Sequence, residues 1–356
     1  MAAVDYKREL KDLIDVVVSE NGSDLHFSVG SHPIVRVTGS LIPLIKKPIL
    51  TDQDVEGFAH ALMSKEKFAE YTENFEADFS YSHADGIRFR GNGFFQSGSM
   101  SIALRLIPNE IKTIAELGLP PILEGFVQRP QGFFLCVGPV GQGKSTTLAA
   151  LVEYINQNRA EHIVTIEDPI EYQYDAKKSL IDQREIGVDS KSFESALNSA
   201  FRQDVDVILV GEMRNAATIS TAVTAAETGH LVLSTLHTNN AAQTIDRIVD
   251  SFPSGQHDQI RVQLAGSLAG IFSQRLIPRI SGGLVPAYEL LINNSAVANL
   301  IREGRTHEIP SMIETGLDHG MIDMNRSLLD LVKRGEITVE NAFAYSANPK
   351  GLERLM

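Results

Sequence analysis

Residues 138–146 read Gly-Pro-Val-Gly-Gln-Gly-Lys-Ser-Thr, a spacing typical of a loop that wraps around phosphates. Glycines let backbone N–H groups approach phosphate oxygens, Lys144 reaches the terminal phosphates, and the Ser145 hydroxyl can ligate Mg²⁺. An apolar run precedes the loop and a helical pattern follows it, as this motif requires, which favours a nucleotide site over a structural glycine turn. The sequence therefore predicts that ATP and Mg²⁺ are bound by Gly138, Pro139, Val140, Gly141, Gln142, Gly143, Lys144, Ser145 and Thr146.

Hydrolysis also needs carboxylates that hold the metal or act on the attacking water. Two apolar runs that read as parallel strands end in acids: one in Glu167 and Asp168, the other in Gly211-Glu212, where an Asp would usually stand in place of the glycine. We expect Glu212 to act on water, with Glu167 or Asp168 supplying charge near Mg²⁺. The alternative is that one of these acids caps a helix or pairs with Arg214.

A histidine follows a third apolar run. The stretch 229–238, Gly-His-Leu-Val-Leu-Ser-Thr-Leu-His-Thr, places His230 and His237 at the two ends of a strand. Their separation is not that of metal ligands, and the single cysteine, Cys136, further disfavours a zinc site. His237 is a candidate γ-phosphate sensor, with an ordinary loop histidine as the equal alternative.

Composition restricts the partners and the location. The formal charge of −13 provides no general attraction to nucleic acid, so no nucleic-acid partner is expected. No apolar run approaches the ~20 residues that span a bilayer, so we expect no direct membrane insertion. Cys136 has no cysteine partner within the chain and suits a buried thiol in a reducing compartment. The expected location is cytoplasmic, with membrane contact through partners.

A length of 356 residues favours two domains. Residues 1–107 begin with a helical pattern and continue as short alternating runs, which indicates a small α+β domain. Residues 108–121 contain three prolines and read as a linker. From residue 122 helices alternate with apolar strands, which predicts an α/β domain with a parallel sheet. The last hundred residues read as mostly helical, with Ile260, Leu264, Leu268 and Ile271 on one stripe.

Four motifs in order resemble those of the secretion ATPase superfamily: GPVGQGKSTT, TIEDPIEY, RQDVDVILVGEMRN and TGHLVLSTLHT. Nearly the whole chain is similar to the type IV pilus retraction branch, which serves twitching motility. The resemblance implies a PAS-like α+β domain over 1–107, a linker over 108–121, and a RecA-like P-loop ATPase domain with a helical tail over 122–356. It also implies an ATP-hydrolysing motor for pilus retraction.

The resemblance further implies a homohexamer in which ATP lies between subunits and is enclosed by a neighbour's N-terminal domain. It makes Glu212 the catalytic glutamate, Glu167 an acidic residue near the metal, and His237 a phosphate contact. The candidates for arginine fingers are Arg88, Arg90 and Arg105; the alternative for each is an ordinary strand-surface charge. The implied partners are an inner-membrane pilus platform protein and the rest of the pilus machinery.

Several positions depart from the pattern of this branch: Val140, Gln142, Val205, Asn215, Ala298 and Asn325. None of them removes a group that must touch phosphate or water. Those in the tail leave open the direction of work and an accessory role, so an accessory or extension ATPase of the same superfamily is one alternative. A non-hydrolysing, nucleotide-dependent regulatory subunit is a separate alternative. A DNA translocase is disfavoured by the acidic balance of the chain.

Overall fold

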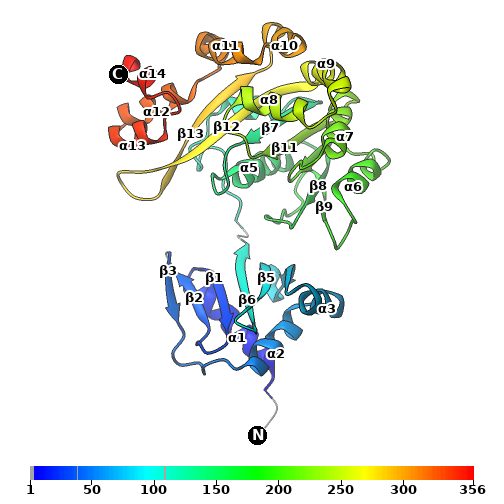
Figure 1. Ribbon diagram of the computed structural model, residues 1–356, viewed down its shortest axis with the longest axis vertical. Coiled ribbons are helices and arrows are strands. Elements are labelled where there is room, and N and C mark those ends of the chain that lie inside the picture. The colour runs from blue at the N-terminus through cyan, green and yellow to red at the C-terminus, as the bar shows by residue number, and fades with distance from the viewer. Residues whose placement is uncertain (1–3, 38, 108–109) are drawn as a thin grey trace. The chain divides into compact units, whose positions relative to one another are not determined.

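The computed structural model describes residues 4–37, 39–107 and 110–356. The chain forms two compact units, Met1–Glu110 and Ile111–Met356 (Figure 1). Within the predicted linker, residues 108 and 109 lie outside the described residues. Further along it, Ile114 and Leu119 are buried in the hydrophobic core of the second unit. Among the described helices, none is long and apolar enough to cross a membrane.

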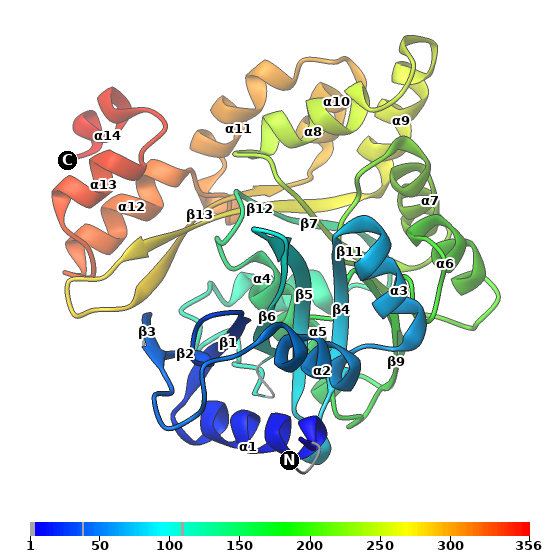
Figure 2. The same ribbon diagram turned by 60° about the horizontal axis from the view of Figure 1, so that its bottom comes forward.

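The first unit is a six-stranded antiparallel sheet with helices packed against it. The strand order is β3-β2-β1-β6-β5-β4. The strands are β1 (Gly22–Ser28), β2 (Ile34–Val37), β3 (Ser40–Pro43), β4 (Glu76–Ser82), β5 (Arg88–Gln96) and β6 (Ser99–Ile107). Helix α1 (Tyr6–Ser19) contacts β1, α2 (Asp52–Leu62) contacts β6, and α3 (Lys65–Asn74) contacts β4 (Figure 2). One shared core links these helices and strands, because alternate strand residues such as Leu25 and Phe27 are buried.

The second unit is built on a seven-stranded sheet of order β13-β12-β7-β11-β10-β8-β9. The pairs are parallel except for β12 with β13. The strands are β7 (Gly132–Val137), β8 (His162–Glu167), β9 (Leu180–Glu185), β10 (Val207–Val210), β11 (Leu231–Leu236), β12 (Leu268–Pro278) and β13 (Leu284–Ile292). Strands β7, β10 and β11 are buried at every residue, which explains the continuous apolar sequences of β7 and β10. In β11 the buried Ser234 and Thr235 hydroxyls donate to the carbonyl oxygens of Val210 and Gly211.

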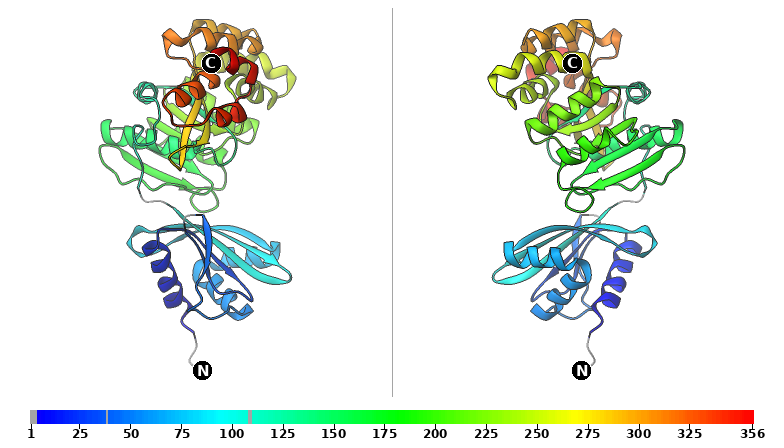
Figure 3. Two further views of the ribbon diagram at one scale, coloured as in Figure 1. Left: turned by 90° about the vertical axis from the view of Figure 1, so that its left-hand side faces the viewer. Right: turned by 90° about the vertical axis from the view of Figure 1, so that its right-hand side faces the viewer.

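Helices cover both faces of this sheet, and each face has its own core. One core includes α4 (Ile122–Val127) and α5 (Lys144–Asn158). The other includes α6 (Phe193–Ala200), α7 (Ala216–Glu227), α8 (Ala241–Asp250), α9 (His257–Ser267), α10 (Ser295–Arg302) and α11 (Ile309–Thr315). The final helices, α12 (Met324–Lys333), α13 (Val339–Tyr345) and α14 (Pro349–Leu355), form a smaller core with the β12–β13 hairpin (Figure 3).

The predicted helical stripe from Ile260 to Ile271 is wrong in its second half. Helix α9 ends at Ser267, and both Leu268 and Ile271 belong to the buried strand β12. A strand buried on both faces is continuously apolar, so its residues also fit a helical spacing and periodicity alone cannot separate the two. The sequence reading therefore missed the β12–β13 hairpin.

Tyr71 provides a test of how the first unit is held together. Its side chain is fully buried, and its hydroxyl lies 3.0 Å from the carbonyl oxygens of Phe94 and Ser101 and accepts the Ser101 N–H at 3.1 Å. Tyr71→Phe leaves these buried groups without a partner, so we expect the free energy of unfolding to fall by about 1–3 kcal/mol. Chemical denaturation measures this loss. An equal loss for Tyr345→Phe, at a surface position, would contradict the explanation.

Candidate active site

The phosphate loop joins the end of β7 to the start of α5, as its motif requires. Lys144 is the first residue of α5 and is 7% exposed. Its ammonium group donates to the carbonyl oxygens of Gly138 at 2.9 Å and Pro139 at 2.8 Å. Burial lowers the pKa of Lys144, which shows that its charge is only partly solvated. The loop thus holds a desolvated cation at the N-terminus of a helix.

His237 lies beside this cation. It follows β11, and its Nδ1 accepts a hydrogen bond from the Lys144 ammonium at 3.3 Å. Partial burial and the nearby Lys144 charge both lower the pKa of His237, so the ring is held neutral. Two residues predicted from separate motifs therefore meet at the carboxyl edge of neighbouring parallel strands.

The rest of the loop is exposed to solvent at Val140 and hydrogen-bonded to other segments at Gln142 and Thr146. Val140 is 80% exposed, whereas the Thr146 hydroxyl lies 2.8 Å from the Tyr172 hydroxyl. The Gln142 carbonyl accepts from the Gln274 amide at 2.7 Å. Neither Tyr172 nor Gln274 was identified from the sequence, because each lies outside the phosphate motif and is brought to it by the fold.

Glu167 ends strand β8 in a buried position. Its side chain is 8% exposed, and its Oε2 accepts the Glu171 N–H at 3.2 Å. Its Oε1 has no hydrogen-bond partner within the described residues. Burial raises the pKa of Glu167 to about 7. Burial therefore favours a proton or a cation at this carboxyl group, while hydrogen bonding with Thr165, Glu171 and Gln183 acts in the opposite direction.

Glu212 follows β10 and is paired with a cation. Its carboxylate forms an ion pair with Arg214, which is the alternative that the sequence left open. The negative charge of Asp168 also acts on Arg214, whose pKa is raised chiefly by its hydrogen bond to Glu212. Arg214 thus interacts with an acid from each of the two motifs, Glu212 and Asp168.

The glycine before Glu212 has a steric reason. A Cβ at Gly211 would lie 3.3 Å from the Ile166 carbonyl oxygen and 3.4 Å from the Glu167 Cα. A side chain at this position would make tight contact with the end of β8, so β8 would have to shift by a few tenths of an ångström to accept it. The site therefore places its acid two positions beyond the end of β10, at Glu212.

The donors present suit a metal ion that takes most of its ligands from phosphate and water. Within residues 4–37, 39–107 and 110–356, no group of three or more His, Cys, Asp or Glu side chains could hold a metal ion. Ser145, at the second position of α5, and the unpartnered Oε1 of Glu167 are oxygen donors of the kind that Mg²⁺ prefers. Asp168 is exposed, and its negative charge acts on Arg214.

The three candidate arginines belong to the first unit, where a row of charge crosses the sheet. Arg36, Asp24, Arg105 and Arg90 are successive cross-strand partners. Arg105 Nε lies 2.9 Å from Asp24, whose pKa is lowered by Ser23, Arg105 and His26 against the effect of burial. Arg90 is exposed and has no ion-pair partner among the described side chains. Arg88 is half-buried.

Three of the departing residues have local structural roles. Asn215 caps α7, because its Oδ1 accepts the Thr218 N–H at 2.9 Å. Asn325 is 9% exposed and donates to the Asn348 carbonyl at 2.9 Å, while its Oδ1 accepts the Ser346 hydroxyl at 2.6 Å. Ala298 packs against the core on α10.

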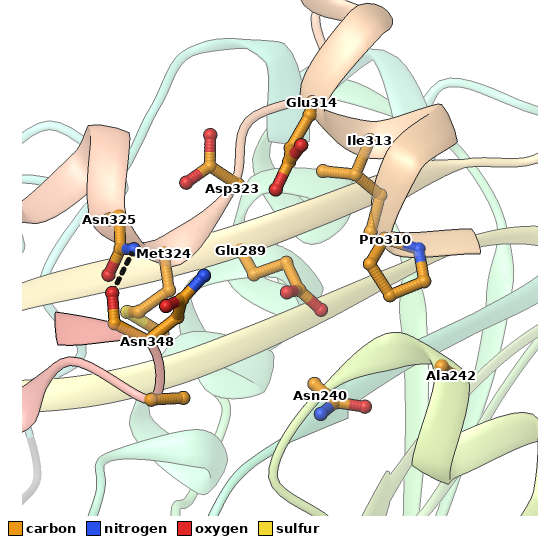
Figure 4. Close-up of a pocket in the computed structure, with 11 residues that line it drawn as sticks. Asn240, Ala242, Glu289, Pro310, Ile313, Glu314, Asp323, Met324, Asn325 and Asn348 are labelled. Carbon is orange, nitrogen blue, oxygen red and sulfur yellow. Dashed lines mark hydrogen bonds between the residues drawn. The ribbon is translucent and has the colours of Figure 1, made fainter. Parts of the chain in front are cut away.

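A separate cavity of about 180 Å³ lies between β13 and the helices that follow it (Figure 4). Its lining includes Asn240, Glu289, Glu314 and Asp323, and none of the phosphate-loop residues. Glu289 Oε1 accepts the Ala241 N–H at the start of α8 at 2.8 Å. Burial raises the pKa of Glu289 to about 7, and Asp323 adds to the effect. This acidic cavity is not the predicted ATP site.

Comparisons with known proteins show the family of the chain. The model of the type II/IV secretion system protein family matches residues 6–306. The type IV pilus retraction ATPase PilT of Pseudomonas aeruginosa is 42% identical over 334 residues, which cover 94% of this chain and 97% of PilT. The type IV pilus ATPase PilU of the same organism is 39% identical over 350 residues, covering 98% of this chain and 91% of PilU.

A solved structure gives the same result for the fold. The crystal structure of the pilus retraction motor PilT with bound ADP superposes with a TM-score of 0.90 and 46% identity. The match covers 96% of this chain and 98% of that one.

The half-buried Glu289, whose carboxyl group is poorly solvated, predicts a pH dependence of stability. Its folded pKa of about 7 lies above the ordinary 4.5, so the stabilisation from its neutral form is complete below about pH 4.5 and is lost as the pH rises through about 7. Glu289→Gln keeps an oxygen for the Ala241 N–H and cannot ionise. Its stability relative to the wild type should therefore increase by about 1–3 kcal/mol from pH 5 to pH 8.

Chemical denaturation at several pH values measures this difference. The matched control is Glu353→Gln, which removes an exposed carboxylate from α14 and leaves Glu289 in place. A pH-independent difference between Glu289→Gln and the wild type would contradict the explanation.

Proposed function

Because the chain belongs to the type II/IV secretion system protein family, we propose that it is the ATPase motor of type IV pilus retraction. The observation that carries this function is the meeting of Lys144 and His237 at the sheet edge where Glu212 follows β10. The similarity to PilT over 94% of the chain supports the direction of work. The chain is an ATPase of this family, and ADP bound to the similar PilT structure supports the nucleotide.

The side chains divide the chemistry among them. The loop N–H groups and Lys144 bind the phosphates, and the already desolvated ammonium loses little solvation when it meets them. Glu212 orients the attacking water and accepts its proton, while Arg214 fixes the direction of that carboxylate. Because His237 Nδ1 accepts from Lys144, the proton of the neutral ring is on Nε2, which can donate to a γ-phosphate oxygen and so respond to whether that phosphate is present.

Ser145 and Glu167 would hold Mg²⁺. When bound, Mg²⁺ neutralises charge on the β- and γ-phosphates during transfer. The unpartnered oxygen of Glu167 supports this role, because a buried carboxylate is stabilised as an anion only by a cation or by hydrogen-bond donors. Asp168 adds negative charge close to Arg214, the cation that pairs with Glu212.

The active form is a homohexamer with ATP at each subunit interface. A neighbouring subunit supplies an arginine to the γ-phosphate, since a guanidinium is permanently charged and binds oxygen pairs. Among Arg88, Arg90 and Arg105, the exposed Arg90 is the preferred candidate, because Arg105 is already engaged by Asp24. Loss of the γ-phosphate releases the interface, and successive releases around the ring turn hydrolysis into motion.

The ring acts on the cytoplasmic side of the inner membrane, where it drives a pilus platform protein so that pilin subunits leave the fibre. ATP is supplied on that side. The similarity to the pilus ATPases PilT and PilU supports this location and these partners.

A second function, that of an accessory pilus ATPase, is favoured by the 39% identity to PilU over 98% of the chain. Deletion of the gene distinguishes these functions. Pili that persist without twitching indicate the principal retraction motor, an unchanged phenotype in the presence of another motor indicates an accessory one, and loss of pili indicates extension.

Steady-state ATP hydrolysis by the purified ring tests the enzyme chemistry. Lys144→Ala should abolish ADP binding and turnover, whereas Glu212→Gln should retain ADP binding and lose kcat at least about a hundredfold. Lys178→Ala, on the exposed surface, is the control for loss of a lysine. Turnover by Glu212→Gln at the wild-type rate would remove Glu212 from the reaction.

Mixed rings test the arginine from the neighbour. Arg90→Ala and Glu212→Gln should each be inactive alone, but a mixture should recover turnover at interfaces where an intact Glu212 faces an intact Arg90. A mixture no more active than its components would place Arg90 outside the neighbour's site. If Arg90 is not the arginine supplied by the neighbour, mixed rings of Glu212→Gln with Arg88→Ala or with Arg105→Ala identify it.

A further inference from the structure

Strand β12 contacts two loops of the site, although it belongs to none of the recognised motifs. Residues 273–276 bind the phosphate loop on one side and the segment after His237 on the other. We propose that Gln274 is a positioning residue for the phosphate loop, and that the β12–β13 hairpin links this loop to helices α8 and α12. This inference rests on the proposed binding of ATP at residues 138–146.

The side chain of Gln274 bridges the loop and the helix that follows it. Its Nε2 donates to the Gln142 carbonyl at 2.7 Å, and its Oε1 accepts the Thr147 hydroxyl at 2.7 Å. Gln274 is 2% exposed, so water cannot replace either bond. Lys144 lies between the two attachment points in the sequence and is held from both sides.

The bond to the Gln142 carbonyl also orients the next N–H group. In a trans peptide the C=O and the following N–H point in opposite directions. With the Gln142 carbonyl directed at β12, the N–H of Gly143 points away from β12, as a phosphate cradle requires. The Gln142 side chain adds a second attachment, because its Oε1 accepts the Leu276 N–H at 2.8 Å.

The glycines of the loop are explained by the same contact. A Cβ at Gly138 would lie 2.5 Å from the Gln274 carbonyl oxygen, and a Cβ at Gly143 would lie 2.9 Å from the Gln274 Nε2. Both glycines also have positive φ angles, 149° and 77°. The loop is therefore packed directly on Gln274, and a shift of one moves the other.

The neighbouring residues of β12 hold the segment after His237. The Ser273 hydroxyl donates to the Asn239 carbonyl at 2.9 Å, and Arg275 Nη2 donates to Asn239 Oδ1 at 3.0 Å. Since alternate residues of a strand point to opposite faces, Ser273 and Arg275 share one face and Gln274 lies on the other. Three consecutive residues thus connect the loops that carry Lys144 and His237.

Strand β13 continues the connection to the helices. Gln274 pairs with Tyr288, whose N–H donates to the Ser327 hydroxyl of α12 at 3.0 Å. Ser273 pairs with Glu289, whose carboxyl group holds the first N–H of α8 beside the cavity of Figure 4. A displacement of the phosphate loop has a continuous hydrogen-bonded route to both helices.

Substitutions that separate the two bonds of Gln274 test its role. Gln274→Met removes both bonds without adding charge, Gln274→Glu keeps the acceptor for Thr147 and loses the donor to the loop, and Thr147→Val removes only the bond to the helix. The full-length protein is titrated with ADP by calorimetry, and ATP turnover gives KM and kcat. Thermal unfolding without nucleotide measures stability independently.

We expect both Gln274 variants to weaken ADP binding and raise KM at least about tenfold, with kcat at saturating ATP within about threefold of the wild type. Thr147→Val should lower thermal stability and leave ADP affinity within about twofold, because the loop bond remains. A merely structural Gln274 would instead lower stability in step with Thr147→Val and leave KM unchanged.

Hydrogen exchange tests the route through the hairpin. ADP should slow amide exchange at the start of α8 in the wild type, and Gln274→Met should abolish that effect at ADP concentrations that saturate the variant. Gln259→Met, on the exposed surface of α9, is the matched control and should behave as the wild type.

The two proposals fail in different ways. A wild-type protein that does not bind ADP would overturn the proposed function. A wild-type protein that binds ADP, together with folded Gln274 variants that bind it equally well, would overturn the positioning role alone. If Gln274→Met does not fold, the isosteric Gln274→Glu decides the question.

Discussion

The buried ammonium group of Lys144 is the interaction on which the rest of the site depends. A cation with little access to water must be held by oxygen atoms, and the loop supplies two of its own carbonyl groups. Those carbonyls can turn inward only because the loop contains glycines at positive φ, and their inward turn leaves neighbouring N–H groups for phosphate. The parallel sheet then brings His237 to the same charge, because the ends of adjacent parallel strands lie at one edge.

The two acidic motifs place similar carboxyl groups in opposite environments. Glu167 is buried with one unpartnered oxygen, and its pKa is raised to about 7, whereas Glu212 faces a guanidinium. Different environments of this kind let two acids of the same chemistry differ in charge state and in the partners they can take. Gly211 eases the close approach of β8 and β10, since a Cβ there would lie 3.3 Å from the Ile166 carbonyl oxygen.

The remainder of the second unit is arranged around a strand that the motifs do not include. Strand β12 pairs in parallel with β7, which leads into the phosphate loop, and antiparallel with β13, which contacts the helical tail. The helical tail therefore packs on the same sheet that carries the phosphate loop. Strand pairing and hydrogen bonds thus run from the phosphate loop to helices outside the site. In the first unit, Arg36, Asp24, Arg105 and Arg90 form a charged row across the sheet.

The sequence by itself determined the phosphate loop, the strand-end acids, the histidine and the two-part α/β architecture, because each depends on local spacing and on apolar runs that leave little choice of structure. It misread Leu268 and Ile271, since a strand buried on both faces has the same apolar content as a helix. Only the tertiary structure decided that Arg214 pairs with Glu212, that Glu167 is desolvated, and that Gln274 holds Gln142 from 132 residues away in the chain. The physical reason is that burial of a side chain and hydrogen bonds between distant segments arise only when the sheet assembles. The pattern of neighbouring residues in the sequence does not specify them.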